Sequence, residues 1–277
     1  MVDFTREEVE AALEEYASTL IEEEEDEFID DEEETVETEV EDESVESPET
    51  TEPEVEFEGA ETPGDIFEGK DLSGLDLSGI KFLGISLKKT NLKSADLSNC
   101  TLSNSNMDQT NLDEANFSNA EMENVNCLEA TALNANFNST NLQGAKFLGS
   151  NLTGSKLESA NLRKAVFLEA NLSKCNLNEA DLSNSDFSRT NMSHASAIES
   201  NLSRARFNGA NLESVNFTDS RLSMAIFFEA NFKNANLSRV QIKGAKLAGG
   251  IFENTGLLRA DITGADLTDA KFHNSNL

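Results

Sequence analysis

Every fifth residue from Phe67 to Leu277 is apolar, and this period continues without a break. Of the 43 positions in the series, 35 are leucine or phenylalanine. An α-helix repeats its buried face every 3.6 residues and a β-strand every 2 residues, so neither element explains a period of five. A strict period over most of a chain is typical of a solenoid, in which each repeat packs on its neighbours.

A second spacing indicates how the repeats stack. Phenylalanines recur at intervals of 20 residues, which is four units of five, and the longest series is Phe147, Phe167, Phe187, Phe207 and Phe227. Of the 14 phenylalanines after residue 60, 13 occupy the central position of a unit. We expect these aromatic columns to form the core, with four pentapeptides in each coil. The result would be 10 to 11 coils in a rod about 50 Å long.

Many units read as an alanine, an aspartate or asparagine, and a leucine, followed by two variable residues. Residues 95–99 (ADLSN), 160–164 (ANLRK), 210–214 (ANLES) and 265–269 (ADLTD) are examples. This pattern resembles the A-(D/N)-L-x-x unit of the pentapeptide repeat proteins. The resemblance implies an all-β fold over residues 62–277, a right-handed quadrilateral parallel β-helix with four pentapeptides per coil. It also points to a bacterial, and notably a cyanobacterial, source.

The negative charge of the chain is concentrated before the repeats. Residues 1–60 contain 28 of the 53 acidic residues and one of the 21 basic residues, so they carry −27 of the net charge of −32. Strong acidity opposes binding to phosphates or anionic lipid and favours basic partners. A solvated tail that keeps the protein in solution is the alternative interpretation.

The first 21 residues predict an amphipathic helix. Thr5 and Glu8 have the spacing of a capping box, which places the start of the helix near Thr5. The apolar residues then follow helical spacing at Val9, Leu13, Tyr16 and Leu20. A single helix over residues 5–21 is marginally stable in water, so we expect these side chains to contact either the solenoid or a partner.

Residues 22–61 are dominated by glutamate, aspartate, serine, threonine and valine. Such a segment buries too little apolar surface to offset its ordering entropy, so it predicts a disordered acidic linker. No stretch of the chain is long and apolar enough to span a bilayer, and the acidic start is unlike a secretory signal. We therefore expect a cytoplasmic protein that does not insert into membranes.

The sequence offers little that could support catalysis. Both histidines, His194 and His273, follow a central residue and should face solvent. The three cysteines, Cys100, Cys127 and Cys175, occupy inward positions, where cysteine acts as a small apolar residue. No nucleophile set, phosphate loop or metal-ligand spacing is evident. We expect no catalytic residues, no metal and no cofactor, and hence no enzyme.

A binding surface is better supported than a catalytic site. Leu128, Leu148 and Leu168 each follow a central residue at positions 20 apart, so they should form one column on one face. Phe228 continues this column three coils later, with Val166 and Ile226 beside it. An apolar stripe on a polar rod is a candidate partner contact, and the partner could be the chain's own N-terminal helix. Scattered surface hydrophobes are the alternative.

The last coil is a second candidate contact surface. The repeat continues to Leu277 with no helix after it, so this coil would expose unpaired backbone groups and core side chains. We expect either an end-to-end homodimer through this coil or capping by the N-terminal helix.

Together these features predict a non-enzymatic protein-binding or scaffold protein that combines a rigid rod with an acidic arm. The alternative comes from the resemblance, because the quinolone-resistance pentapeptide proteins bind DNA gyrase as DNA mimics. Residues 61–277 carry a net charge of only −5, which weakens a duplex-like field. No direct contact with nucleic acid is expected.

Overall fold

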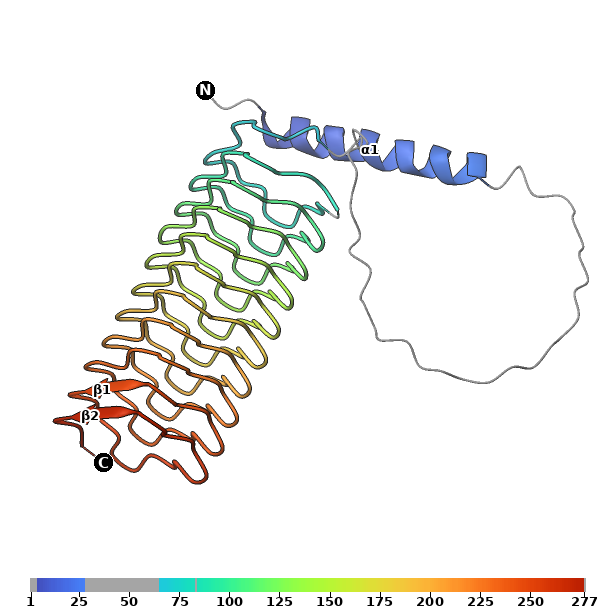
Figure 1. Ribbon diagram of the computed structural model, residues 1–277. Coiled ribbons are helices and arrows are strands. Elements are labelled where there is room, and N and C mark those ends of the chain that lie inside the picture. Colours follow the sequence, from blue (N-terminus) through green and yellow to red (C-terminus); the bar gives the residue numbers. More distant parts are fainter. Residues whose placement is uncertain (1–3, 28–64, 83, 277) are drawn as a thin grey trace, which may run out of the picture.

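The computed structural model describes residues 4–27, 65–82 and 84–276, and it shows a rod with a helix at one end (Figure 1). Helix α1 spans Arg6–Glu27 and lies across the first coils. Strands β1 (Ile251–Glu253) and β2 (Lys271–His273) lie near the other end and pair in parallel, with Phe252 opposite Phe272. The wall between these ends is built from much shorter pairings.

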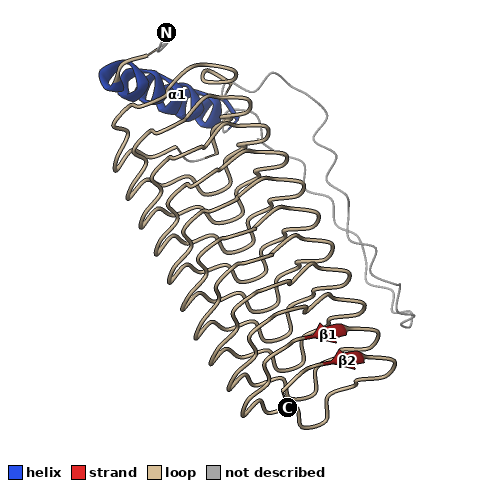
Figure 2. Cartoon of the chain, turned by 90° about the vertical axis from the view of Figure 1, so that its left-hand side faces the viewer, coloured by secondary structure: helices blue, strands red, loops and turns tan. Residues whose placement is uncertain are grey.

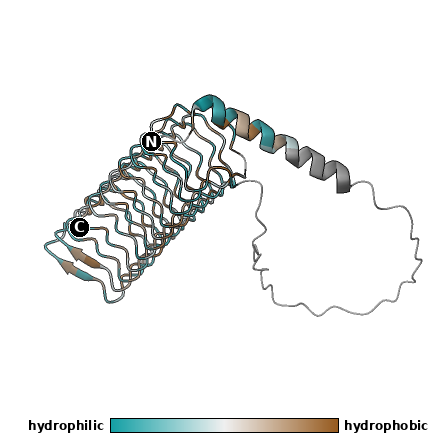
Figure 3. Cartoon of the chain, turned by 90° about the horizontal axis from the view of Figure 1, so that it is seen from above, coloured by the Kyte–Doolittle hydropathy of each residue, from teal (hydrophilic) through white to brown (hydrophobic). Residues whose placement is uncertain are grey.

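Parallel bridges join residues 20 positions apart along the rod, from Asp71 and Asn91 to Gly256 and Asn276. The chain therefore rises by one coil every four pentapeptides and forms a stack of similar coils (Figure 2). Apolar and polar residues alternate around the coils (Figure 3). The predicted fold class, a right-handed quadrilateral parallel β-helix, is confirmed.

Backbone hydrogen bonds between coils hold the wall together. Around Leu112, the amides of Asn111, Leu112 and Glu114 donate to carbonyls of the coils before and after at 2.6–3.0 Å. The same pattern recurs in unit after unit, so most amides of the wall are satisfied without long strands. The rod is rigid because each coil is bonded to both of its neighbours.

Each pentapeptide ends in a tight turn that the sequence analysis did not predict. The residue two places after every described central residue has a φ between +52° and +74°, in 31 non-glycine and 11 glycine residues. At Ser94 φ is 55°, and the amide of Ala95 donates to the Leu92 carbonyl at 3.0 Å. This is the geometry of a type II turn. The signal was available, because 11 of the 15 glycines lie in this one register.

The central residues fill the interior, as predicted. In the longest phenylalanine series, from Phe147 to Phe227, neighbouring rings stack with centroids 4.8–5.1 Å apart and planes within 7° of parallel. A second column contains Phe232, Phe252 and Phe272 at 4.7 Å. Stacked rings bury a large apolar area and keep successive coils in register.

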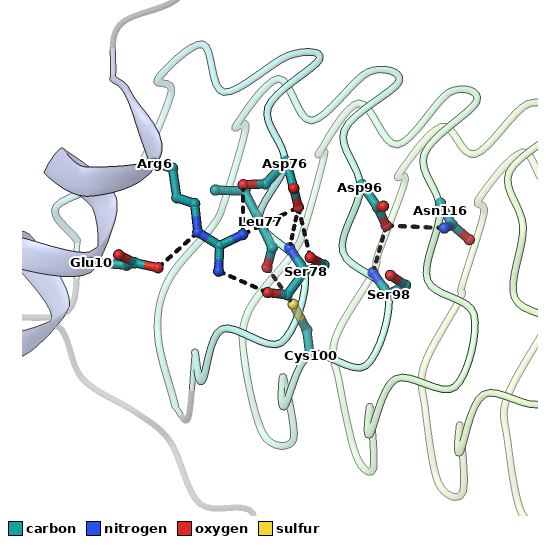
Figure 4. Close-up of polar contacts among 9 residues, drawn as sticks. All are labelled: Arg6, Glu10, Asp76, Leu77, Ser78, Asp96, Ser98, Cys100 and Asn116. Atoms are coloured by element: carbon teal, nitrogen blue, oxygen red, sulfur yellow. Dashed lines mark hydrogen bonds and ion pairs between the residues drawn. The ribbon is translucent and has the colours of Figure 1, made fainter.

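Side chains outside the core add a second ladder. Asp96 Oδ1 accepts hydrogen bonds from the Ser98 amide and from Asn116 Nδ2 of the next coil, both at 3.0 Å (Figure 4). The first bond closes an Asx turn within the unit, and the second joins neighbouring coils. This explains why aspartate or asparagine so often precedes the central residue.

The three cysteines are buried and free, in agreement with their expected packing role. The thiols of Cys100 and Cys175 donate to the carbonyls of Leu77 and Leu152 in the preceding coil. Burial raises the pKa of Cys100 to about 11 and that of Cys175 to about 12, and it raises the pKa of Cys127 further still. A thiol with such a pKa stays protonated and unreactive at neutral pH.

Helix α1 begins where the capping box predicts and continues beyond the expected end. The Thr5 amide donates to Glu8 Oε2 at 2.7 Å, and the Glu8 amide donates to Thr5 Oγ1 at 3.3 Å. The predicted end at residue 21 is wrong, because the helix extends to Glu27. Residues 22–27 are five glutamates and one aspartate, and glutamate favours helix. The remainder of the expected linker, residues 28–61, lies outside the described residues.

Candidate binding surfaces

The N-terminal helix lies on its own solenoid, which answers a question that the sequence left open. Val9 is fully buried, and Leu13 and Tyr16 are half-buried against the core. The ring of Phe4 meets Phe67 edge-on, with centroids 5.5 Å apart. The side chain of Leu20, the fourth expected contact, lies outside the described residues. Because α1 covers the first coils, it does not occupy the apolar stripe predicted on the side of the rod.

Arg6 fastens the helix to the first coils. Its guanidinium donates to Glu10 Oε1 at 2.8 Å, to Asp76 Oδ1 at 3.2 Å and to the Ser78 carbonyl at 3.0 Å (Figure 4). The hydrogen bond to Glu10 raises the pKa of Arg6. The pKa of Asp76 is lowered by hydrogen bonds from the Ser78 hydroxyl and amide and by the charge of Arg6. This network is solvent-exposed, so it orients the helix more than it stabilises it.

The leucine column, Leu128, Leu148 and Leu168, occupies three successive coils. The amides of Glu129 and Gly149 donate to the carbonyls of Leu148 and Leu168 at 2.9 and 3.0 Å, which places the three leucines in one row. Leu148 is 36% exposed, and the leucines on either side are half-buried. Val166 is half-buried beside them and pairs with Lys146 through the backbone.

Phe228 and Ile226 do not join the leucine column. The two intervening coils carry Ser188, which is buried, and an ion pair in which Arg206 Nε lies 3.9 Å from Asp186 Oδ2. The predicted single stripe is therefore divided into two apolar surfaces by polar side chains. The leucine column is one of them, and the other is centred on Phe228.

The second surface includes a residue that sequence reasoning missed. Met224 is 59% exposed, Phe228 is 41% exposed, and Ile226 between them is half-buried. We call Met224, Ile226 and Phe228 the corner patch, because Met224 lies at the turn between two sides of the coil. Its sulfur lies over Gly244 of the next coil, only 2.8 Å from where a Cβ would stand. The sequence contained a signal for this exposed residue, because Met224 occupies the position two residues after a central residue, which elsewhere is mostly glycine, asparagine or a charged residue.

The coil that contains Ile262 and Phe272 exposes part of its interior. These two central residues are 36% and 40% exposed, and Leu267 is half-buried. Leu277, which the sequence analysis placed in the same coil, lies outside the described residues. The side chains of this region form a small apolar depression with the coils before it.

The described residues contain no group of three or more histidine, cysteine, aspartate or glutamate side chains arranged to hold a metal ion. In the same part of the chain, no helix is both long enough and apolar enough to cross a membrane. His194 and His273 are distant from each other along the rod, in coils that start some 80 residues apart.

Three solved structures illustrate what the chain is similar to. HetL, a pentapeptide repeat protein involved in heterocyst differentiation regulation in the cyanobacterium Nostoc, is 26% identical, with a TM-score of 0.40 over 74% of this chain and 88% of HetL. A pentapeptide repeat protein of the Arabidopsis thaliana thylakoid lumen is 30% identical, with a TM-score of 0.34 over 34% of this chain and 66% of its own. Full-length QnrB1, a plasmid-mediated fluoroquinolone resistance protein, is 23% identical, with a TM-score of 0.26 over 71% and 90% of the two chains.

The family models agree with the repeat read from the sequence. A model described as pentapeptide repeats (8 copies) matches overlapping segments between residues 71 and 189 and again at residues 241–277. A model described as a pentapeptide repeat region matches residues 170–247. No curated protein matches the chain. With matches that together span residues 71–277, the chain belongs to the pentapeptide repeat family.

Proposed function

We propose that this protein is a non-enzymatic binding scaffold whose rod presents side-chain surfaces to protein partners. The observation that carries the proposal is the leucine column on the side wall of the rod. Three leucines in successive coils, with Val166 beside them, form a contiguous apolar strip. Apolar side chains that gather in one place on a surface mark contacts more often than scattered ones do.

The rigidity of the wall supports this role. The leucines stand on backbone that is hydrogen-bonded to the coils on both sides. A partner that binds them therefore loses little free energy to ordering of this surface, since the surface is already fixed. The strip is small, so we infer a weak or transient contact, strengthened by other surfaces of the rod.

Affinity capture with the full chain tests the proposal. The variant Leu148→Ser/Leu168→Ser should keep the fold, because both side chains point away from the core, and should lose the captured partner. Leu133→Ser is the matched control, since Leu133 occupies the same position in its pentapeptide on another face and is half-buried. Equal recovery of the same partner by both variants would rule out the leucine column.

The acidic arm is proposed as a second contact, for a basic partner. Residues 1–60 carry a net charge of −27, which would accelerate association with a cationic surface. A partner is assigned to the arm if its binding is lost when the salt concentration is raised and is unchanged in the variant Leu148→Ser/Leu168→Ser. A partner retained at high salt does not bind through the arm.

We also propose an end-to-end homodimer through the coil of Ile262 and Phe272. Pairing two such coils would cover the side chains that are 36% and 40% exposed. Light scattering on the full chain should give a dimer mass that Phe272→Glu reduces to a monomer. A monomer mass for the unmodified chain would refute the dimer.

A further inference from the structure

A cluster of cations surrounds the corner patch. In three successive coils, the two sides that meet at Met224 contain five basic residues and one acidic residue, Glu229. The basic residues are all exposed: Arg204, Arg206, Arg221, Lys243 and Lys246. This concentration of positive charge lies on a chain whose net charge is −32.

The backbone places these cations directly beside the apolar side chains. Ile226 is bridged to Arg206 on one side and to Lys246 on the other. The Met224 amide donates to the Lys243 carbonyl at 3.0 Å. The patch is therefore an apolar centre with positive charges in the coils before and after it.

Four of the five cations have no ion-pair partner within 4 Å among the described residues; the fifth, Arg206, lies 3.9 Å from Asp186. Acidic residues bound the cluster in the next coil, where Asp261 and Asp266 lie. The pKa of each of these carboxyls is lowered mainly by a threonine hydroxyl and also by the charge of Lys243 or Lys246. The exposed guanidinium and ammonium groups remain free to bind an added carboxylate.

A further polar group at this place has no partner. Asn208 lies one coil before Phe228 in the same column, and its Oδ1 is the one buried side-chain oxygen or nitrogen in the described residues without a hydrogen bond. A buried acceptor without a hydrogen-bond donor is uncommon in a folded protein.

We propose that the corner patch and its cations bind an acidic segment of a partner protein that carries apolar side chains between its carboxylates. Methionine, isoleucine and phenylalanine at the centre favour apolar anchors, and the surrounding cations favour the acidic side chains. The rest of this acidic chain repels such a segment, so electrostatics directs it to this place. The inference rests on the proposed binding role of the rod but uses a surface separate from the leucine column.

A binding assay with a defined probe tests this inference. The probe is a fluorescein-labelled peptide that alternates glutamate with valine and phenylalanine, added to the full chain. Arg204→Glu/Arg221→Glu should weaken its binding by about tenfold or more, since two favourable charge contacts are reversed. Phe228→Ser should weaken it as well. Arg163→Glu/Lys164→Glu makes the same charge change two coils earlier on the same side and should leave binding unchanged.

The alternatives give different results. Equal weakening of probe binding by Arg163→Glu/Lys164→Glu would show unspecific charge attraction and would overturn the site. Absence of probe binding to the unmodified chain would also overturn it. Tighter binding of a single-stranded oligonucleotide than of the peptide would do the same. Zero-length carbodiimide crosslinking should join Lys243 or Lys246 to the probe. Crosslinks from these lysines to residues 22–61 of the same chain would overturn the proposal of a partner segment, because they would show that the chain's own acidic arm binds the corner patch. None of these outcomes affects the test of the leucine column, whose variant Leu148→Ser/Leu168→Ser should still bind the probe.

Discussion

At the scale of single residues, the pentapeptide is defined by a left-handed turn as much as by its apolar centre. A non-glycine residue in the left-handed region costs about 1–2 kcal/mol relative to the right-handed one. In this chain 31 non-glycine residues adopt it. The wall compensates, because the amide of the strained residue itself bonds to the next coil, as Ser94 does to the Asp113 carbonyl at 2.8 Å.

Glycine at such a turn should therefore stabilise the rod. We expect Ser139→Gly, at a φ of 59°, to raise the free energy of unfolding by about 0.5–1 kcal/mol. Ser118→Gly is the control, since Ser118 has a negative φ and should lose stability. Urea denaturation followed by circular dichroism measures both changes. A destabilised Ser139→Gly variant would show that the turn is not strained.

The cysteines give a second prediction at this scale. With pKa values of about 11 and 12, Cys100 and Cys175 should not react with a thiol reagent at pH 8 in the folded protein. All three should react after unfolding. Burial of the protonated Cys100 thiol also makes the stability depend on pH, because the pKa of this thiol in the folded protein lies above the ordinary value of 9.0. The stability that this thiol contributes is complete below pH 9 and decreases as the pH rises toward 11. Rapid labelling of the folded protein at pH 8 would contradict the buried positions.

At the scale of elements, helix α1 covers the first coils and shields core that would otherwise face solvent. Val9 and the Phe4–Phe67 contact provide the apolar part of this interface, and Arg6 fixes its direction. Burial of one valine side chain contributes about 2 kcal/mol. The partly buried side chains of Leu13 and Tyr16 add to this contact with the core.

Val9→Ser should release the helix without unfolding the rod. We expect faster hydrogen exchange at the amides of Leu72 and Leu77, which lie in the first coil, and unchanged exchange beyond residue 120. Ala11→Ser, on the exposed side of the helix, is the control and should leave all rates unchanged. Unchanged exchange in the Val9 variant would mean that the helix does not protect the first coil.

The parts of this structure that follow from the sequence are those governed by a period. The five-residue period and the 20-residue spacing from Phe147 to Phe227 determine the number of pentapeptides in each coil, and both depend on burial alone. The end of α1 depends on the helix propensity of residues 22–27, where no period exists. The division of the apolar stripe could have been read from the sequence, which has Asp186, Ser188 and Arg206 at intervening positions. The coordinates add that Ser188 is buried and that Arg206 lies near Asp186.

At the scale of the whole molecule, the distribution of charge argues against the competing hypothesis of DNA mimicry. A duplex mimic needs a continuous negative field along the rod, but the rod is nearly balanced and carries five cations around the corner patch. We therefore predict that the full chain leaves DNA gyrase supercoiling unchanged at micromolar concentration. Inhibition that survives Leu148→Ser/Leu168→Ser would favour the mimic instead.

The most direct test of a binding scaffold is photocrosslinking from the rod itself. A photoreactive amino acid placed at position 148 of the full chain should yield one discrete larger adduct in cells of the source organism, because Leu148 is the most exposed member of the leucine column. The same amino acid at position 133, on another face, should not yield that adduct. Identical adducts from both positions, or none from position 148, would contradict a partner bound at the leucine column.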